Sequence, residues 1–303
     1  MAESEYERIR TRCLENDKLW DDLDFPAAAS SIHPDYSEPE DWLWKRPKDI
    51  CENPQFVIDG AHRFDLSQGE LGDCWFISSA AILATKPNLF EQVVPPRQDF
   101  VNDYAGIFRF RFWQFGEWVE VVVDDKLPVD VDDKLKFGQN REEPNEFWGP
   151  LLEKAYAKLY GSYQAIDTGH LRDALVDMTG GLSELYNLKR TDDLPPNLFE
   201  ILTQSFEAGS LVGCGIWNDR LATREEELTN GLFKGHAYSI TSILETRVEG
   251  WLVKLIRLRN PWGRREWNGA WSDKSDEWKV VPDEVKKKIG LTYEDEGCPL
   301  MIG

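Results

Sequence analysis

Residues 68–75 read QGELGDCW, and this octapeptide places a cysteine at the start of a stretch that favours a helix. The run from Trp75 to Ala84 contains neither glycine nor proline, so it predicts a helix whose first turn carries Cys74. A thiol at that position feels the positive end of the helix dipole, which favours the thiolate. The side-chain amide of Gln68 and the backbone N–H of Cys74 then form a candidate two-donor oxyanion hole. A buried structural cysteine is the alternative, and the octapeptide alone leaves both interpretations open.

A nucleophilic thiol needs an imidazole, and the imidazole needs a third group that fixes its orientation. Among the four histidines, His236 stands at the start of an alternating, strand-like run and has small neighbours. Asn260 follows a second alternating run, and Pro261 holds it extended at the end of that strand. The amide oxygen of Asn260 is therefore a candidate acceptor for His236. The alternatives are a strand histidine satisfied by the backbone and an ordinary Asn-Pro turn.

The order Gln68, Cys74, His236, Asn260 is that of the papain-type thiol proteases, although Leu71 stands where the secreted enzymes carry a disulfide cysteine. The chain resembles more closely the calpains, which are calcium-activated intracellular cysteine proteases. This resemblance rests on segments that follow in order over most of the chain: residues 68–76, 104–128, 145–163, 234–241 and 259–271. It implies an α+β, papain-like cysteine protease fold, with a helical N-terminal subdomain, a β-rich C-terminal subdomain and the active-site cleft between them.

The same resemblance implies an activity and partners. It implies a calcium-dependent cysteine endopeptidase that performs limited proteolysis of cytosolic proteins through Cys74, His236 and Asn260. It also implies that Trp262 shields the hydrogen bond between Asn260 and His236 from water. The expected partners are protein substrates and, in full-length members of the family, a small regulatory subunit or an inhibitor protein.

One calcium ion in each half of the core is a further implication of the resemblance. In the first half the matching ligands are the carbonyl oxygens of Ile58 and Gly60 and the carboxylates of Asp65 and Glu146. Gly60 allows a sharp turn in this acidic loop, which suits a hard cation with oxygen ligands. From the residues alone, a solvated acidic loop is the alternative. In the second half the matching positions are Glu266, Asp273 and Asp295.

The composition limits the class of protein. The chain has 303 residues, 41% of them hydrophobic, which is enough for two compact domains. Five scattered cysteines without a C-x-x-C pair predict neither a disulfide framework nor a zinc site, and fit a reducing, cytoplasmic location. The net charge of −20 argues against a nucleic-acid partner. No apolar run reaches the roughly 20 residues of a transmembrane segment, and residues 1–12 are too polar for a secretion signal.

The periodicity of apolar residues predicts two subdomains. Residues 1–73 look loop-rich. Beyond the central helix, residues 106–123 predict a hairpin, Asn145 is expected to cap an amphipathic helix closed by Gly161, and a short helix follows. After Gly180-Gly181 we expect a helix over 196–208 and strands over 211–217, 237–244 and 251–259. These elements predict a helical subdomain over 1–180 and a strand-rich one over 181–303, with the diglycine as a hinge or, alternatively, as a helix C-cap and turn.

The last residues depart from the family pattern. After Asp295 the family continues into a strand that completes the second subdomain, whereas this chain follows a different sequence to Gly303. We therefore expect a truncated second subdomain that lacks sheet strands and leaves an edge exposed. The departure keeps open a catalytically impaired isoform that acts as a calcium-binding or regulatory protein. An acyl-transferring transglutaminase is another alternative; Asn260 argues against it, because that class orients its histidine with an aspartate.

Overall fold

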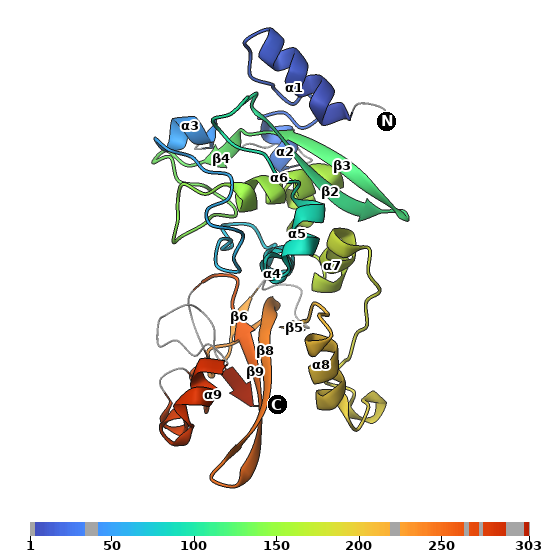
Figure 1. The fold of residues 1–303 in the computed structure, drawn as a ribbon, viewed down its shortest axis with the longest axis vertical. Helices are drawn as coiled ribbons and strands as arrows, with labels where there is room; N and C mark the ends of the chain where they lie inside the picture. The colour runs from blue at the N-terminus through green and yellow to red at the C-terminus, as the bar shows by residue number, and fades with distance from the viewer. Residues whose placement is uncertain are drawn as a thin grey trace. The chain divides into compact units, whose positions relative to one another are not determined.

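A computed structural model describes residues 4–33, 42–218, 225–263, 267–272, 275–288 and 300–302. The chain divides into two units, residues 1–181 and 182–303 (Figure 1). Helices and antiparallel sheets occur together, so the predicted α+β class is confirmed. Among the described residues, no helix combines the length and the apolarity needed to cross a membrane.

The first unit is mainly helical. Its described helices are α1 (Glu5–Glu15), α2 (Ala29–Ile32), α3 (Pro47–Ile50), α4 (Cys74–Ala84), α5 (Pro87–Val93), α6 (Trp148–Tyr160), the 3-10 helix η1 (Gln164–Ile166) and α7 (Leu171–Thr179). Its described strands are β1 (Leu43–Lys45), β2 (Ile107–Gln114), β3 (Glu117–Asp124) and β4 (Leu127–Val129).

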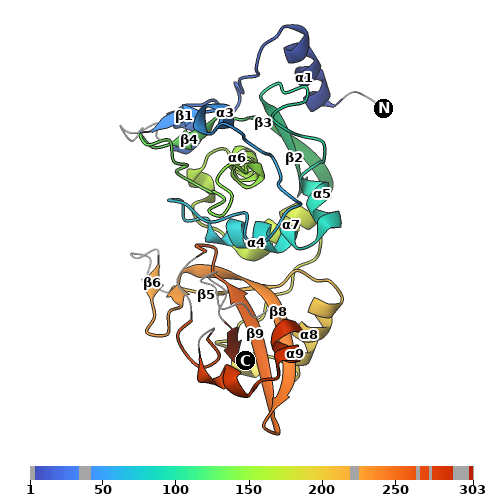
Figure 2. The same cartoon turned by 60° about the vertical axis from the view of Figure 1, so that its left-hand side comes forward.

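Helix α4 forms the centre of this unit. Its eleven residues are apolar or small on every side, and all of them are buried. Phe76 of α4 stacks on Tyr156 of α6 with ring centroids 4.4 Å apart. Helices α4 and α7 lie side by side (Figure 2). The first residue of α4, which is the predicted nucleophile, therefore sits on a helix that the core holds along its whole length.

The predicted hairpin is confirmed. Strands β2 and β3 pair in register from Ile107–Asp124 to Gln114–Glu117, and the two residues between them, Phe115 and Gly116, both have positive φ. Such a two-residue turn matches the twist of the flanking strands. The three alternating phenylalanines of β2 face the core and are buried.

Two expectations for the first unit were wrong. Residues 5–15 form α1, where we expected loops, because Ser4 caps its N-terminus and three spaced residues (Tyr6, Ile9 and Cys13) pack into one apolar cluster. Helix α6 begins at Trp148 with Phe147 as its N-cap, so Asn145 does not cap it. The backbone around residue 145 instead pairs with residues 53–56, and this pairing keeps residues 145–147 out of the helix.

The second unit is built on one antiparallel sheet. Its described strands are β5 (Gly213–Ile216), β6 (Glu226–Glu227), β7 (Phe233–Lys234), β8 (His236–Val248), β9 (Trp251–Arg259) and β10 (Leu300–Ile302). Its described helices are the 3-10 helix η2 (Thr191–Asp193), α8 (Leu198–Glu207), the 3-10 helix η3 (Asp276–Val280) and α9 (Asp283–Lys288). The strand order is β10-β9-β8-β5, while β6 and β7 form a separate short ladder. Figure 1 shows the long β8–β9 hairpin of this unit.

The edge of this sheet differs from the expectation. We expected β9 to lose its neighbour at the C-terminal end of the chain, but residues 300–302 form β10 and pair antiparallel with Leu255–Arg257 of β9. The expectation of an exposed edge at these positions was therefore wrong. Backbone pairing depends on register and not on the family's side-chain sequence, so a different sequence can still supply the strand.

Candidate active site

Cys74 occupies the first position of α4, directly after the N-cap residue Asp73. Its side chain is buried, with 6% of the residue exposed. The unpaired backbone N–H groups of the first helical turn and the helix dipole both favour a negative charge at this end. The position of Cys74 at the start of α4 agrees with the predicted helix, and its role as a nucleophile stays a prediction.

The loop that leads to Cys74 is held by close backbone contacts at its glycines. A Cβ on Gly69 would lie 2.2 Å from the carbonyl oxygen of Phe137, and one on Gly72 would lie 2.6 Å from that of Asp167. The N–H of Gly72 also donates to the Asp167 carboxylate over 2.9 Å. These glycines are therefore required for close approach, and they fix the path of the chain into α4.

Gln68 is buried in the same loop. Its Nε2 donates to the carbonyl oxygen of Leu71 over 2.6 Å. A side-chain amide carries two hydrogens, and this contact uses one of them. The second hydrogen remains chemically suited to a developing oxyanion, which is the role predicted for Gln68.

A pair of buried carboxyl groups stands next to Cys74, and our sequence reasoning missed it. Asp73 precedes the cysteine, while Glu153 comes from α6 and accepts a hydrogen bond from the N–H of Gly138 over 2.8 Å. Burial raises the pKa of both carboxyl groups, and the nearness of Glu153 raises that of Asp73 further. The spacing of apolar residues in α6 does not reveal that Glu153 is buried, because polar residues of this helix are buried as well.

The imidazole part of the predicted site lies in the second unit. Continuing the β8–β9 register past Arg259 brings the residues after β9 to the start of β8, where His236 stands. The Nε2 of His236 lies 2.8 Å from the Oδ1 of Asn260, and both residues are buried. The N–H of Trp262 donates to the same Oδ1 over 3.1 Å, which identifies this atom as the amide oxygen.

Aromatic rings enclose His236. The ring of Trp262 lies with its centroid 4.6 Å from that of the imidazole, and the ring of Tyr238 lies 5.0 Å away. Phe233 packs on Trp262 at 4.5 Å. A hydrogen bond in such surroundings is less exposed to competition from water than one at the surface. The indole of Trp262 packs against the imidazole, and its shielding role stays a prediction.

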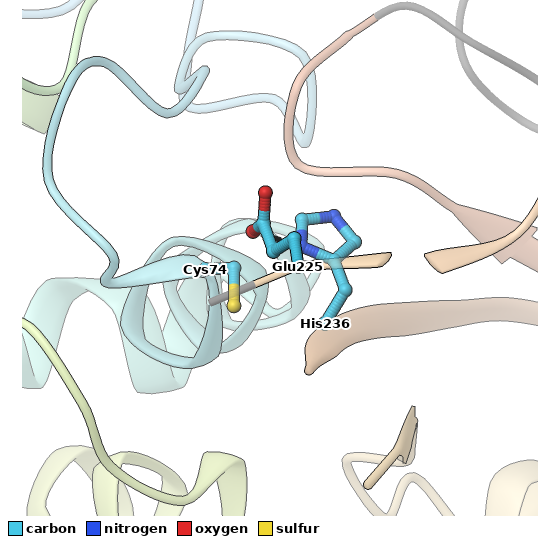
Figure 3. Close-up of side chains that lie close together, drawn as sticks. All are labelled: Cys74, Glu225 and His236. Atoms are coloured by element: carbon cyan, nitrogen blue, oxygen red, sulfur yellow. Dashed lines mark hydrogen bonds and ion pairs between the residues drawn. The ribbon is translucent and has the colours of Figure 1, made fainter. Parts of the chain in front are cut away.

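Glu225 is a second partner of His236 that our sequence reasoning missed. Its Oε1 lies 2.9 Å from the Nδ1 of the imidazole, and its side chain is 25% exposed. Figure 3 shows the carboxylate of Glu225 beside the imidazole, and it shows Cys74 at the start of α4. Glu225 begins a run of three glutamates, and nothing in the sequence indicates which of them folds back toward the histidine.

The predicted calcium ligands of the first half lie around the loop at residues 58–65. Glu146 accepts hydrogen bonds from the N–H of Ile58 and, over 2.7 Å, from the side chain of Asn140. Asp65 accepts from the N–H of His62 over 2.6 Å. Both carboxyl groups are buried.

The charges and the backbone of the loop at residues 58–65 indicate whether it suits a cation. Burial raises the pKa of Glu146 to about 7, and the charge of Asp65 contributes to that rise. Asp59 and Gly60 both have positive φ, which bends the loop sharply. Two buried carboxylates that repel one another, next to a sharply bent backbone, fit a hard cation with oxygen ligands. The second-half positions, Glu266, Asp273 and Asp295, lie outside the described residues.

Comparisons of this chain with a family model and with individual proteins indicate the same family. A family model described as "Calpain family cysteine protease" matches residues 20–302. Calpain-B of Drosophila melanogaster is 45% identical over 304 residues, which cover 98% of this chain and 32% of that protein. Calpain clp-1 of Caenorhabditis elegans is 47% identical over 294 residues, covering 97% and 37%. The calpain-2 catalytic subunit of Mus musculus is 46% identical over 296 residues, covering 96% and 42%. The chain thus spans 32% to 42% of the length of these relatives.

Proposed function

The chain belongs to the calpain family of cysteine proteases, and on this premise we propose that it is a calcium-dependent endopeptidase whose catalytic residues are Cys74, His236 and Asn260. The observation that carries the proposal is the buried 2.8 Å contact between His236 Nε2 and Asn260 Oδ1, enclosed by aromatic rings. An imidazole oriented through Nε2 can pair with a thiol only through Nδ1, and this division of the two nitrogens is the arrangement that a cysteine nucleophile needs.

In the proposed reaction the thiolate of Cys74 attacks the carbonyl carbon of a peptide bond, while His236 holds the proton as an imidazolium. The side-chain amide of Gln68 and the backbone N–H of Cys74 donate to the oxyanion. His236 then gives its proton to the leaving amine as the C–N bond breaks. It next removes a proton from the water that hydrolyses the thioester. Asn260 is neutral, so it orients the ring without adding a charge to the thiolate–imidazolium pair.

We propose that calcium is bound in the first unit by the carbonyl oxygens of Ile58 and Gly60 and by the carboxylates of Asp65 and Glu146. When bound, the ion neutralises the two carboxylates and orders the loop that holds them. Further ligands in the second unit are Glu266, Asp273 and Asp295, by resemblance to the family.

The substrates and partners in this proposal follow from the family. The proposed substrates are cytosolic proteins that undergo limited cleavage, and the proposed location is the cytoplasm. A reducing compartment suits the four described cysteines, which are free thiols. The mouse relative is named a catalytic subunit. A small regulatory subunit is therefore a proposed partner of this chain as well, together with an inhibitor protein.

The test is peptide hydrolysis with and without calcium by three proteins: wild type, Cys74→Ser and Cys51→Ser. Cys51 is a partly exposed cysteine away from the proposed site, so its variant is the matched control. We expect calcium-dependent cleavage by wild type and Cys51→Ser, and a loss of at least about a thousandfold in Cys74→Ser. Equal cleavage by Cys74→Ser would overturn the proposal. Calcium binding without cleavage by any of the three would favour a calcium-binding regulatory protein.

A further inference from the structure

Both ring nitrogens of His236 face oxygen atoms within the second unit. Nε2 lies 2.8 Å from Asn260 Oδ1, and Nδ1 lies 2.9 Å from Glu225 Oε1. The Asn260 atom is an oxygen because the N–H of Trp262 donates to it. Nε2 therefore donates to Asn260, and an imidazole that also carries a proton on Nδ1 is the charged imidazolium. In that form, the contact between Glu225 and His236 is a charge-assisted hydrogen bond.

This contact engages the atom that the proposed chemistry needs. Nε2 is committed to Asn260, so Nδ1 is the nitrogen through which His236 must pair with the thiolate. A carboxylate at Nδ1 offers the imidazolium the same kind of partner as a thiolate does, namely an anion that accepts its proton in a hydrogen bond. The carboxylate of Glu225 and the thiolate of Cys74 cannot both accept a full-strength hydrogen bond from the single N–H at Nδ1.

We infer that Glu225 competes with the catalytic thiolate for the Nδ1–H of His236 and restrains the protease until it is displaced. The inference rests on the proposed Cys-His chemistry, which supplies the thiolate. It adds to that chemistry an inhibitory contact made by the chain's own side chain.

The position of Glu225 is suited to release. It directly precedes β6, whose two residues pair with the two of β7, and β7 leads through Gly235 to His236. An ion pair between Lys234 and Glu226, at 3.0 Å, lies across this ladder. A quarter of the Glu225 side chain is exposed, so water can solvate the carboxylate as it leaves, whereas the His236 side chain is fully buried. Displacement therefore requires a local movement and no opening of the β8–β9 sheet.

The other side chains described against the ring are aromatic. Phe233 and Trp262 are apolar at the faces they present, and the hydroxyl of Tyr238 accepts from the N–H of Phe233 over 2.9 Å. Among the described residues of the second unit, the ring of His236 contacts aromatic rings, the amide of Asn260 and the carboxylate of Glu225. Removing the charge of Glu225 tests the inference directly.

The first experiment measures peptide hydrolysis at limiting and at saturating calcium for wild type, Glu225→Gln and Glu227→Gln. Glu227 is exposed and lies two residues away on β6, so its variant controls for the loss of one negative charge. A neutral amide is a weaker acceptor than a carboxylate, so we expect Glu225→Gln to cleave about tenfold faster than wild type at limiting calcium. The difference should shrink at saturating calcium, and Glu227→Gln should behave as wild type. Unchanged or slower cleavage by Glu225→Gln would overturn the inference.

A second measurement does not depend on catalysis. In calcium-free Cys74→Ser protein, NMR follows the ring protons of His236 as a function of pH, assigned by comparison with a His236→Gln variant. We expect adding Glu225→Gln to move the midpoint of this titration to lower pH, because the imidazolium loses its anionic partner. An unmoved midpoint would overturn the inference even if the protein proves to be a protease. A moved midpoint in a protein that cleaves nothing would instead locate the failure in the proposed function.

Discussion

Asp73 and Glu153 place two carboxyl groups inside the first unit, beside the residue proposed as the nucleophile. Two buried carboxylates that lie close together cannot both ionise without a large cost, so the pair retains a proton at pH values where isolated carboxyl groups have lost theirs. A retained proton also limits the negative charge that this pair places at the start of α4.

This pair makes stability depend on pH. Burial raises the pKa of Glu153 from 4.5 to about 7 in the folded protein. A carboxyl group whose pKa is raised by folding contributes most below its unfolded pKa, and that contribution is lost as pH rises through the folded pKa. The wild-type free energy of unfolding should therefore fall between about pH 4.5 and pH 7 on account of this pair.

Glu153→Gln should reduce that fall. The amide can accept from Gly138 and donate to an ionised Asp73, so the variant should lose less stability between pH 5 and pH 8, by on the order of 2 kcal/mol. Urea unfolding at the two pH values measures the difference. Glu91→Gln, at an exposed position of α5, is the control and should leave the pH dependence unchanged. An identical pH dependence in Glu153→Gln and wild type would contradict this account.

At the residue level, the sequence predicted the positions of side chains whose local structure depends on adjacent residues. Cys74 is set by the helix that it begins, and Asn260 is set by Pro261 and by the strand before it. Glu225 and Glu153 could not be predicted in this way. Each meets its partner only through tertiary packing. A glutamate is usually exposed to solvent, so its sequence position alone does not predict a buried partner.

Among the structural elements, the loop at residues 58–65 and the segment just before α6 bring together two carboxylates of like charge, Asp65 and Glu146. The indole N–H of Trp148 donates to Asp65 over 3.2 Å, while Glu146 is tied to the loop through the N–H of Ile58. These hydrogen bonds hold the acids in place, although the charge of Asp65 works against the ionised form of Glu146. A bound cation would remove that conflict, since it attracts both carboxylates.

Calcium should therefore raise the temperature at which the wild-type protein unfolds, because an ion that binds only the folded state stabilises it. At a calcium concentration about ten times the dissociation constant, one site contributes about 1.4 kcal/mol. We expect Asp65→Asn to show a clearly smaller calcium-induced shift. Asp59→Asn is the matched control, because its side chain is exposed and asparagine tolerates the positive φ at that position. Calorimetry with and without calcium measures the shifts, and equal shifts in wild type and Asp65→Asn would contradict the proposed site.

The elements themselves were predictable to different degrees. The β2–β3 hairpin and strand β9 follow from alternation and turn residues, and their observed bounds agree with the prediction. Helix α1 was missed because its three buried residues are spaced among charged ones and gain their burial from a distant hairpin. Strand β10 was missed because a three-residue strand has too short a pattern to recognise, and only its pairing with β9 defines it.

For the whole chain, the predicted family and the α+β fold class are confirmed. The family match covers residues 20–302 and hence most of both units. The proposed nucleophile belongs to the first unit, and the proposed imidazole and its orienting amide belong to the second. The account therefore requires that groups from the two units act together when calcium is bound.

The most direct test of that requirement is the alkylation of the five cysteines by limiting iodoacetamide, mapped by mass spectrometry with and without calcium. Iodoacetamide reacts with thiolates, and a thiolate paired with an imidazolium persists at neutral pH. The account predicts that Cys74 is modified well ahead of the other four cysteines in calcium, and that this lead disappears in His236→Gln. Comparable modification of all five cysteines in calcium, or a lead of Cys74 that survives the loss of His236, would contradict it.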